Sequence, residues 1–362
     1  MDLPVPTTID DLDPDWLTEA LRGSELAGDA AVTEFECEQI GIGLGVLALL
    51  YRLTLVYEPA GAGPETLVVK IGSTHPPTRE VVAGYRFYER EVAFYRDVAD
   101  RVSLTTPVCA HAAFNPAGGD FVIVMEDVGG LRSVSQLDGC SLEDARAVLG
   151  HLARHHAGWW LNDDLLTIDT LQTTAEPPYP EFNRQQAMQG WPRCQEILGD
   201  RMPPQVHDLG SAFSEVGPAL LVEAADRPWT FNHGDLRLDN LFFDDEGGMT
   251  VLDWQIGFRT YGANDLGYFL SQSLRIDDRR EHEEGLVRGY HDALLAGGVE
   301  DYPFDELWED YRRAILFCFN YPMTAAGQLD ISDERSLALV TSMMDRSVAA
   351  ITDLDAIELR PG

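Results

Sequence analysis

The stretch FNHGDLRLDNLFFDDEGGMTVLDWQIGF, from Phe231 to Phe258, contains three polar residues at separations that suggest a reaction site. Asp235 is followed by Asn240 five residues later and by Asp253 a further thirteen residues on. The pattern predicts a strand, a turn and a second strand, so Asn240 and Asp253 would supply oxygen ligands from two arms of one hairpin. Mg²⁺ prefers one or two protein oxygens together with phosphates and water. Asp235, on the preceding loop, could then accept a proton from a hydroxyl nucleophile.

This order of a base, an amide ligand and a carboxylate ligand matches the phosphoryl-transfer arrangement of protein kinases. The alternative is a surface hairpin with solvated carboxylates, and we adopt that interpretation for the turn DDEGG at 244–248. The loop HGDLRLDN differs, because apolar runs flank it on both sides. Asp235, Asn240 and Asp253 are therefore predicted to be functional.

Lys70 is the only lysine among the 26 basic residues of the chain, and it stands near the end of the apolar run TLVVKIG. A codon bias of the genome explains the excess of arginine, but it does not assign a role to the one lysine. The helical pattern that follows contains Glu89 and Glu91 in YEREVAFY. Residues two apart cannot both face the same side of a helix, so at most one of them faces Lys70.

Eight motifs follow one another in the order of a known superfamily: GIGLGV, LVVKIG, REVAFYRDV, VIVMEDV, HLARHHAGWW, HGDLRLDN, VLDWQ and NDLGYFL. The chain resembles the aminoglycoside phosphotransferase and choline kinase superfamily, whose motif HGDxxxxN stands here at His233 to Asn240. Within it, the chain is similar to the ecdysteroid kinase-like branch. The glycine-rich segment departs from a tidy fingerprint and is weak by itself, whereas the order of the other motifs covers nearly the whole chain.

The resemblance implies a bilobal protein-kinase-like fold of the α+β class that binds ATP and Mg²⁺. Asp235 would be the catalytic base, and Asn240 and Asp253 would hold Mg²⁺ on the triphosphate. Arg237 would meet the transferring phosphate, as a basic residue at this place does in kinases, and a surface salt bridge is the alternative. His233 would organise the loop by hydrogen bonding and would not act as a base.

The resemblance also implies a set of nucleotide contacts. Lys70 would pair with the α- and β-phosphates and with Glu91, which stands at the family's position ahead of the FY pair. The glycine-rich loop, with Gly41, Gly43 and Gly45, would cover the phosphates. The backbone of the hinge VMEDVGG would contact adenine at Glu126, Asp127 and Val128. Asp265 in NDLGYFL either accepts backbone N–H groups of the catalytic loop or simply caps a helix, and both interpretations stay open.

Two domains are expected for 362 residues. Residues 1–127 are predicted to form an N-terminal nucleotide-binding lobe, with a helical extension at 8–28, an antiparallel meander of strands at 32–41, 47–58 and 66–72, one helix at 77–101 and a strand at 120–126. Residues 128–362 are predicted to form a larger, mainly helical catalytic lobe that begins with a helix at 141–160. The segment 161–205 is predicted to be irregular, as a lid or an insertion.

The net charge of −35 disfavours nucleic acid and anionic membranes as partners. Five scattered cysteines without a CxxC pair argue against a disulfide framework or a zinc ribbon. No apolar run reaches the length of a membrane span, and the acidic N-terminus lacks the features of a signal peptide, so a cytoplasmic protein is expected.

A small-molecule acceptor is favoured over a protein. Gly234 stands where a protein kinase has the arginine that reads a phosphorylated activation loop, and only eleven residues separate Asp253 from Asp265. That leaves no room for a long activation segment. The acceptor hydroxyl could belong to an antibiotic, a sterol-like compound or another metabolite. The alternatives are a catalytically silent nucleotide-binding module and a protein kinase. The acceptor, ATP versus GTP, and the oligomeric state stay open.

Overall fold

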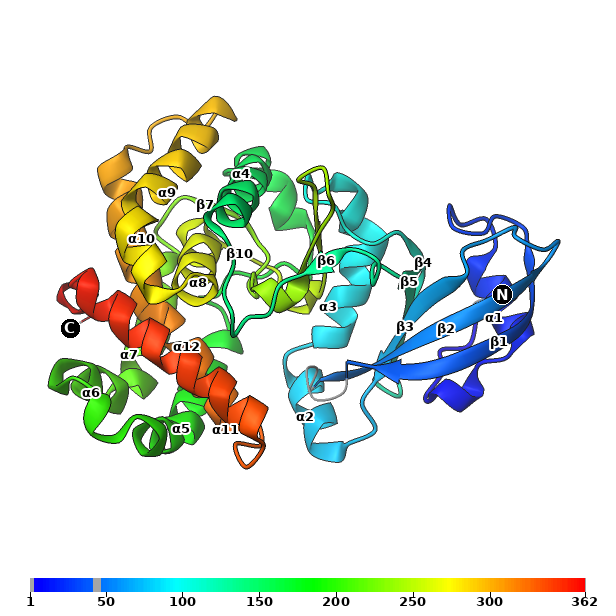
Figure 1. Ribbon diagram of the computed structural model, residues 1–362, viewed down its shortest axis with the longest axis horizontal. Helices are drawn as coiled ribbons and strands as arrows, with labels where there is room; N and C mark the ends of the chain where they lie inside the picture. The colour runs from blue at the N-terminus through cyan, green and yellow to red at the C-terminus, as the bar shows by residue number, and fades with distance from the viewer. Residues whose placement is uncertain (1–2, 42–46, 362) are drawn as a thin grey trace. The chain divides into compact units, whose positions relative to one another are not determined.

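The structure, a computed structural model, describes residues 3–41 and 47–361, and the chain divides into two compact units. Unit 1 comprises Met1–Leu131 together with Thr250–Ile256, and unit 2 comprises Arg132–Met249 and Gly257–Gly362. Figure 1 labels the elements of each unit. The segment Thr250–Ile256, which contains Asp253, therefore packs with residues far from it in sequence. The prediction of a single boundary between residues 127 and 128 does not include this return of the chain to unit 1.

Unit 1 is built on a five-stranded antiparallel sheet in the order β1-β2-β3-β5-β4. The strands are β1 (Ala31–Ile40), β2 (Ala48–Glu58), β3 (Thr66–Gly72), β4 (Cys109–Asn115) and β5 (Asp120–Glu126). The predicted meander of the first three strands is confirmed. The sequence CAHAAFN does not predict β4, because it lacks the alternation of apolar and polar residues that marks a half-buried strand. Lys70 lies in β3 opposite Leu50 of β2 and Ile123 of β5, in the middle of the sheet.

The prediction of one helix over 77–101 is wrong. The chain forms α2 (Pro76–Gly84) and α3 (Phe87–Ala93), then a π-helical turn (Phe94–Val98) and a 3₁₀ turn (Ala99–Arg101). Arg86 separates the two α-helices with a φ of 57°, a left-handed conformation that interrupts right-handed helix geometry. The break places Glu91 on the short helix α3, where it is buried.

The N-terminal segment packs on the sheet of unit 1. It contains a 3₁₀ turn (Ile9–Asp11) and α1 (Pro14–Leu21), which is shorter than the helix predicted over 8–28. The Asp13 side chain caps α1 by accepting a hydrogen bond from the backbone N–H of Trp16 at 2.7 Å. Trp16 and Leu17 join a core with Leu53 of β2 and Val69 of β3. This apolar core fixes the strand that carries Lys70.

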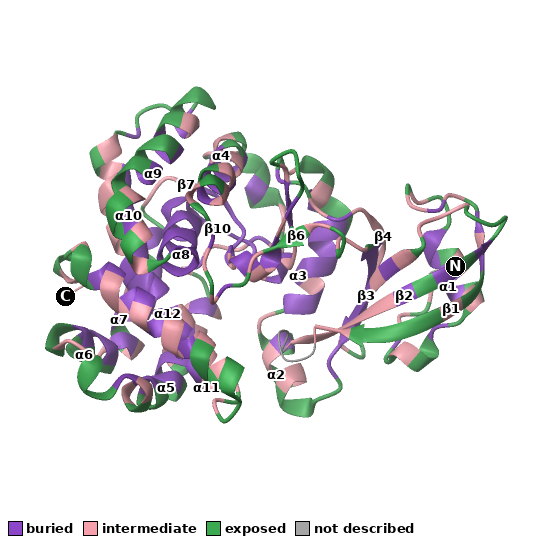
Figure 2. Cartoon of the chain, in the orientation of Figure 1, coloured by how far each residue is buried: buried purple, intermediate pink, exposed green. Residues whose placement is uncertain are grey.

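Unit 2 is mainly helical, as predicted. Its helices are α4 (Leu142–Gly158), α5 (Tyr179–Leu198), α6 (Pro204–Ser211), α7 (Phe213–Ala224), α8 (Ala263–Ser273), α9 (Ile276–Ala296), α10 (Phe304–Cys318), α11 (Asn320–Gln328) and α12 (Glu334–Asp353). All eleven residues of α8 are buried, and Figure 2 shows this helix purple along its length. The centre of unit 2 is therefore α8, which follows the strand β10 (Phe258–Tyr261).

The short strands of unit 2 hold the loop with the HGD motif. β7 (Trp229–Asn232) pairs with β10 antiparallel and ends directly before His233. A 3₁₀ turn (Leu238–Asn240) leads into β8 (Leu241–Phe243), which pairs with β6 (Arg132–Ser133). β9 (Met249–Val251) then carries the chain from unit 2 into unit 1. The predicted strand–turn–strand order after the loop is confirmed.

The expectation that 161–205 is irregular is wrong, because α5 occupies residues 179–198 of it. Pro192 lies inside this helix and, with the flanking Pro, Thr and Gln residues, hides the helical pattern. Gly190 lets α5 approach α11 closely, since a Cβ there would lie 1.9 Å from the Met323 carbonyl oxygen. None of the helices in the described part of the chain is long and apolar enough to cross a membrane.

Candidate active site

The loop after β7 is anchored by Asp265 on α8. Gly234 has a φ of 84°, which favours glycine and turns the chain sharply before Asp235. The Asp265 carboxylate accepts the backbone N–H of His233 at 2.7 Å and that of Gly234 at 2.9 Å. Gly262 is the N-cap of α8, so the helix-cap interpretation of Asp265 is wrong and the loop-anchor interpretation holds. The anchor fixes the backbone beside Asp235.

Asp265 is fully buried, and its ionisation depends on its neighbours. Burial alone would raise the pKa of this carboxyl, but hydrogen bonds from His156 and from the backbone of Gly234 lower the pKa below its ordinary value. His156 Nε2 lies 3.6 Å from Asp265 Oδ2, and its Nδ1 lies 2.6 Å from the Tyr290 hydroxyl oxygen. The loop anchor is therefore a charged carboxylate inside unit 2.

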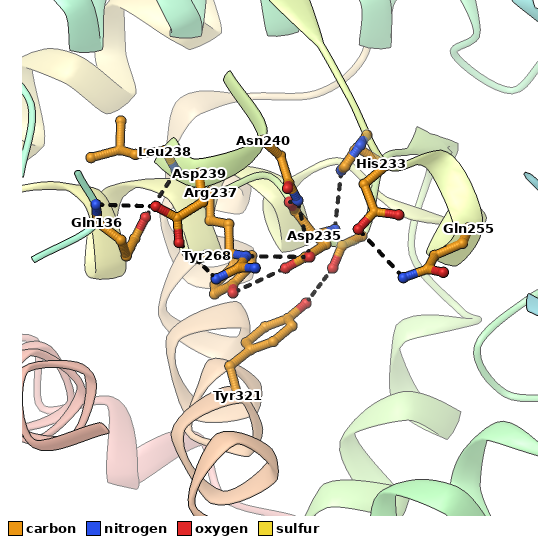
Figure 3. Close-up of polar contacts among 12 residues, drawn as sticks. Gln136, His233, Asp235, Arg237, Leu238, Asp239, Asn240, Gln255, Tyr268 and Tyr321 are labelled. Atoms are coloured by element: carbon orange, nitrogen blue, oxygen red, sulfur yellow. Dashed lines mark hydrogen bonds and ion pairs between the residues drawn. The ribbon is translucent and has the colours of Figure 1, made fainter. Parts of the chain in front are cut away.

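Several donors converge on the carboxylate of Asp235 (Figure 3). Asn240 Nδ2 donates to Asp235 Oδ2 at 3.0 Å and to the Asp235 backbone oxygen at 2.9 Å. Arg237 Nε lies 3.4 Å from the same Oδ2, and its Nη1 donates to Asp239 at 3.0 Å. Tyr268, on α8, donates its hydroxyl to Asp235 Oδ1 at 3.1 Å. Asp235 is 16% exposed, so its carboxylate is held by these donors and still reaches the surface of unit 2.

Asn240 has the orientation that a metal ligand would need. An ionised carboxylate only accepts hydrogen bonds, so the Nδ2 group of Asn240 must face Asp235. Its amide oxygen then remains as a candidate ligand for a hard cation. Among the residues that the structure describes, no three His, Cys, Asp or Glu side chains form a metal-binding group.

His233 is completely buried, and its ring accepts a hydrogen bond from its own loop. The backbone N–H of Asp235 donates to His233 Nδ1 at 3.2 Å. In this contact the ring nitrogen Nδ1 is the acceptor. The contact shapes the loop and agrees with an organising role for His233.

In unit 1, Lys70 lies between two carboxylates. Its Nζ is 2.7 Å from both oxygens of Glu91 and 2.9 Å from Asp253 Oδ1. Glu89 forms its ion pair with Arg86 instead. Lys70 and Glu91 are 7% and 1% exposed, whereas the Asp253 side chain keeps 27% of its surface in contact with solvent. The lysine on β3, the glutamate on α3 and the carboxylate after β9 therefore form one cluster.

Each charged group in this cluster shifts the pKa of its partners. Burial alone would lower the pKa of Lys70, but Asp253 and Glu91 raise it above its ordinary value. Burial also raises the pKa of Glu91, to about 7, against the attraction of Lys70. The ammonium is thus charged at neutral pH, and the attraction of Lys70 keeps the pKa of Glu91 from rising further.

Asp253 is positioned by its backbone and by the residues beside it. Its φ is 66°, a left-handed conformation that Asp tolerates better than most residues and that often occurs at functional sites. Trp254 stacks on Phe94 of the π-helical turn, with 4.1 Å between ring centroids and 6° between ring planes. Gln255 Nε2 donates to Asp253 Oδ2 at 3.4 Å. Asn240 and Asp253 belong to different units, so a cation shared by them stays a prediction.

The remaining predicted nucleotide residues lie in unit 1. Gly41 follows β1 with a φ of 67°, which favours glycine, while Gly43 and Gly45 lie outside the described residues. At the hinge, the backbone N–H of Glu126 donates to the Val108 carbonyl at 2.9 Å. The carbonyl of Val128 accepts a hydrogen bond from the Leu131 N–H at 2.9 Å. An adenine contact there would therefore use the other backbone groups, or the second lone pair of a carbonyl.

Four side chains at these sites were not predicted as site residues from the sequence. Tyr268 and Tyr321 contact the Asp235 loop, and Gln136 accepts the Leu238 N–H through Oε1 at 2.8 Å. In unit 1, Arg52 Nε donates to Asp127 Oδ2 at 2.6 Å, and this pair fixes the hinge. The only available signal was the place of Tyr268 within NDLGYFL; the other three have none.

A model of the ecdysteroid kinase-like family matches residues 44–297. A search of curated protein sequences gave no match. Solved structures of low identity are similar to the chain. One, from Ralstonia eutropha JMP134 and assigned to the aminoglycoside phosphotransferases, has a TM-score of 0.56 at 15% identity, with 96% of this chain and 98% of that chain covered.

Two further structures contain ligands. A GDP complex of an aminoglycoside 2′-phosphotransferase variant has a TM-score of 0.53 at 11% identity, with 89% of this chain and 93% of that chain covered. Amicoumacin kinase in complex with AMP-PNP, Ca²⁺ and Ami has a TM-score of 0.50 at 15% identity, with 84% and 86% covered. At these identities the similarity shows the fold, and the predicted kinase-like α+β fold is confirmed.

Proposed function

The chain belongs to the ecdysteroid kinase-like family, and we propose that it transfers the γ-phosphate of ATP to a hydroxyl group of a small molecule. The observation that carries this proposal is the cluster of Lys70 with Glu91 and Asp253, a charged lysine held by two carboxylates in unit 1. Such a lysine can exchange one carboxylate for the phosphates of a nucleotide without leaving its glutamate. Residues 1–127 would bind the nucleotide, and residues 128–362 would carry the base and the acceptor site.

In the proposed reaction, Asp235 accepts the proton of the acceptor hydroxyl as that oxygen bonds to the γ-phosphorus, and the bond from the γ-phosphorus to the β–γ bridging oxygen breaks to release ADP. Asn240 keeps the carboxylate in place through its Nδ2 group, and Arg237, 3.4 Å from Asp235, lies near enough to meet the transferring phosphate. His233 and Asp265 hold the loop. When bound, Mg²⁺ would neutralise phosphate charge, and Asn240 and Asp253 would hold it.

A small-molecule acceptor follows from the short connection between Asp253 and Asp265. Its eleven residues contain a 3₁₀ turn (Trp254–Ile256) and β10, which leaves no length for an activation segment. The matched family and the solved structures suggest the compounds to test first: steroid alcohols, aminoglycosides and amicoumacin. A cytoplasmic location suits a supply of ATP and is part of the proposal.

The test is release of ADP by the purified chain with Mg²⁺ and ATP, measured across a panel of hydroxylated compounds and confirmed by mass spectrometry of a phosphorylated product. Asp235→Ala should abolish acceptor-dependent release and leave nucleotide binding unchanged. Nucleotide binding without turnover for every acceptor would support the silent module. Phosphorylation of added proteins in place of small molecules would support a protein kinase.

A further inference from the structure

Two tyrosines lie against each other beside the catalytic loop. Tyr268 of α8 and Tyr321 of α11 stack with 3.6 Å between ring centroids and 11° between ring planes. Phe317 of α10 packs edge-to-face on Tyr321, at 6.2 Å and 78°. Since the helices α8, α10 and α11 all belong to unit 2, the three rings form a fixed aromatic wall.

The hydroxyl groups of the pair contact successive residues of the loop (Figure 3). Tyr268 donates to Asp235 Oδ1 at 3.1 Å, and Tyr321 donates to the Gly234 carbonyl at 2.9 Å. Together with Asp265, which accepts the N–H of Gly234, the pair bonds both sides of the sharp turn at this glycine. Packing alone does not need two hydroxyls here, because phenylalanine rings would stack in the same way.

Both tyrosines are donors over the whole range of pH in which the protein would work. Burial raises the pKa of Tyr268 and of Tyr321 well above the ordinary value, so neither loses its proton.

We propose that Tyr268 and Tyr321 are positioning residues that fix the carboxylate of Asp235 for proton transfer. Tyr268 sets the rotation of the carboxylate, and Tyr321 sets the backbone that carries it. The proposal rests on the proposed function for its kinetic test, but the fixing of the loop can be measured without turnover. The two hydroxyls have different tasks, and the experiment separates them.

Tyr268→Phe should lower kcat by about tenfold to a hundredfold, the effect of losing a hydrogen bond to a charged group. The nucleotide dissociation constant should not change, because the Tyr268 hydroxyl contacts the base and not the predicted nucleotide residues. Tyr321→Phe should lower kcat by about tenfold, since its hydroxyl contacts the backbone that carries the base. A purely structural role would lower thermal stability without a selective loss of kcat at an unchanged nucleotide dissociation constant.

The matched control is Tyr302→Phe. Tyr302 is also buried and donates its hydroxyl to Asp310 at 2.8 Å, away from the loop. The control should lose thermal stability to a similar extent and keep wild-type kcat. The proposal is overturned if Tyr268→Phe keeps kcat within twofold of the wild type, or if Tyr302→Phe loses as much activity.

Hydrogen–deuterium exchange of the peptide over residues 233–240 tests the pair independently. Exchange should become about tenfold faster in Tyr268→Phe and Tyr321→Phe than in the wild type and in Tyr302→Phe. Unchanged exchange in both variants would refute the positioning role, whether or not turnover is found. A wild-type protein that turns over no acceptor would refute the proposed function and leave this measurement to decide on the pair.

Discussion

Replacing Lys70 by methionine tests how the buried cluster of unit 1 is held together. Methionine keeps an unbranched apolar side chain of similar length but removes the ammonium that lies 2.7 Å from Glu91. The carboxylate of Glu91 is then buried without its cation, and breaking a buried pair in this way costs about 3–5 kcal/mol. Glu91 can avoid most of this cost by binding a proton, so the loss of stability should depend on pH.

The sign of this dependence follows from the pKa of Glu91, which burial raises to about 7 in the presence of Lys70. A carboxyl whose pKa is raised on folding binds its proton in the folded state, and it costs stability as the pH rises toward that pKa. Up to pH 7 the wild type and Lys70→Met lose stability in parallel. Above pH 7 the wild type levels off, since Glu91 is already ionised there with Lys70 as its partner. In the variant the pKa of Glu91 is higher still, so its stability continues to fall.

The gap in unfolding free energy should therefore be small at pH 6 and should widen above pH 7 by up to about 1.4 kcal/mol per pH unit. That amounts to about 3 kcal/mol at pH 9. Urea unfolding at pH 6, 7.5 and 9 measures it, because urea, unlike guanidinium, adds no salt. Asp253 contributes less, since its side chain is 27% exposed and keeps water.

The double variant Lys70→Met/Glu91→Gln is the control. It cannot ionise at position 91, so its difference from the wild type in unfolding free energy should not widen above pH 7. Lys70→Arg keeps the charge and should follow the wild-type pH dependence, while losing activity by about tenfold or more because the broader guanidinium does not fit the site. A gap that is equal at pH 6 and pH 9 would refute the account of the cluster, and so would a double variant with the same slope as Lys70→Met.

Two further predictions concern the carboxylates that serve the loop and the cation. Asp253→Ala should abolish Mg²⁺-dependent ADP release. The circular dichroism spectrum should not change and the melting temperature should change little, since Glu91 still holds Lys70. Normal turnover in this variant would show that the metal assignment is wrong. Asp265→Asn should cost about 2–3 kcal/mol in urea unfolding at pH 7, because an amide replaces a carboxylate that accepts two backbone N–H groups. The pKa of Asp265 is lowered in the folded state, so its contribution is complete above the unfolded value and fades as the pH falls through the folded one. The difference between this variant and the wild type should therefore stay constant from pH 6 to about pH 4 and shrink below that; a difference that does not shrink below about pH 4 would contradict an ionised anchor.

The fold was predictable wherever a local pattern is strong. The alternation in the sequence of β1, the branched and aromatic residues of β2 and the glycine-rich connections between the three runs predict an antiparallel meander, and the pairing of these strands confirms it. β4 and α5 were missed for opposite reasons, because β4 has no alternation and α5 contains Pro192, which normally ends a helix. The break at Arg86 was missed as well, since nothing in its neighbours signals a positive φ. In each case packing in the folded chain outweighs the local preference.

Within the candidate site, the residues that act on a nucleotide were predictable from the sequence, and the residues that position them were not. Residues that act on a nucleotide are confined to a few types at fixed spacings, so Lys70, Asp235, Asn240 and Asp253 stand in motifs. Residues that hold them in place are not confined in this way. Tyr268 contacts Asp235 across 33 positions of sequence, Tyr321 reaches Gly234 across 87, and Gln136 reaches Leu238 across 102. Many other side chains could have supplied these hydrogen bonds, so their types leave no pattern to find.

The one lysine of the chain can be compared with a buried arginine in unit 2. Arg279, 1% exposed, spreads its contacts over two nitrogens: Nη1 bonds both oxygens of Glu283 at 2.9 Å, and Nη2 contacts Asp353. Lys70 instead meets Glu91 and Asp253 with the single atom Nζ. A planar fork suits partners that lie side by side, whereas an ammonium suits partners that converge on one point. A codon bias toward arginine can therefore replace lysine wherever the partners lie side by side. At position 70 the two carboxylates converge on one atom, so an arginine there would keep the charge without matching the geometry.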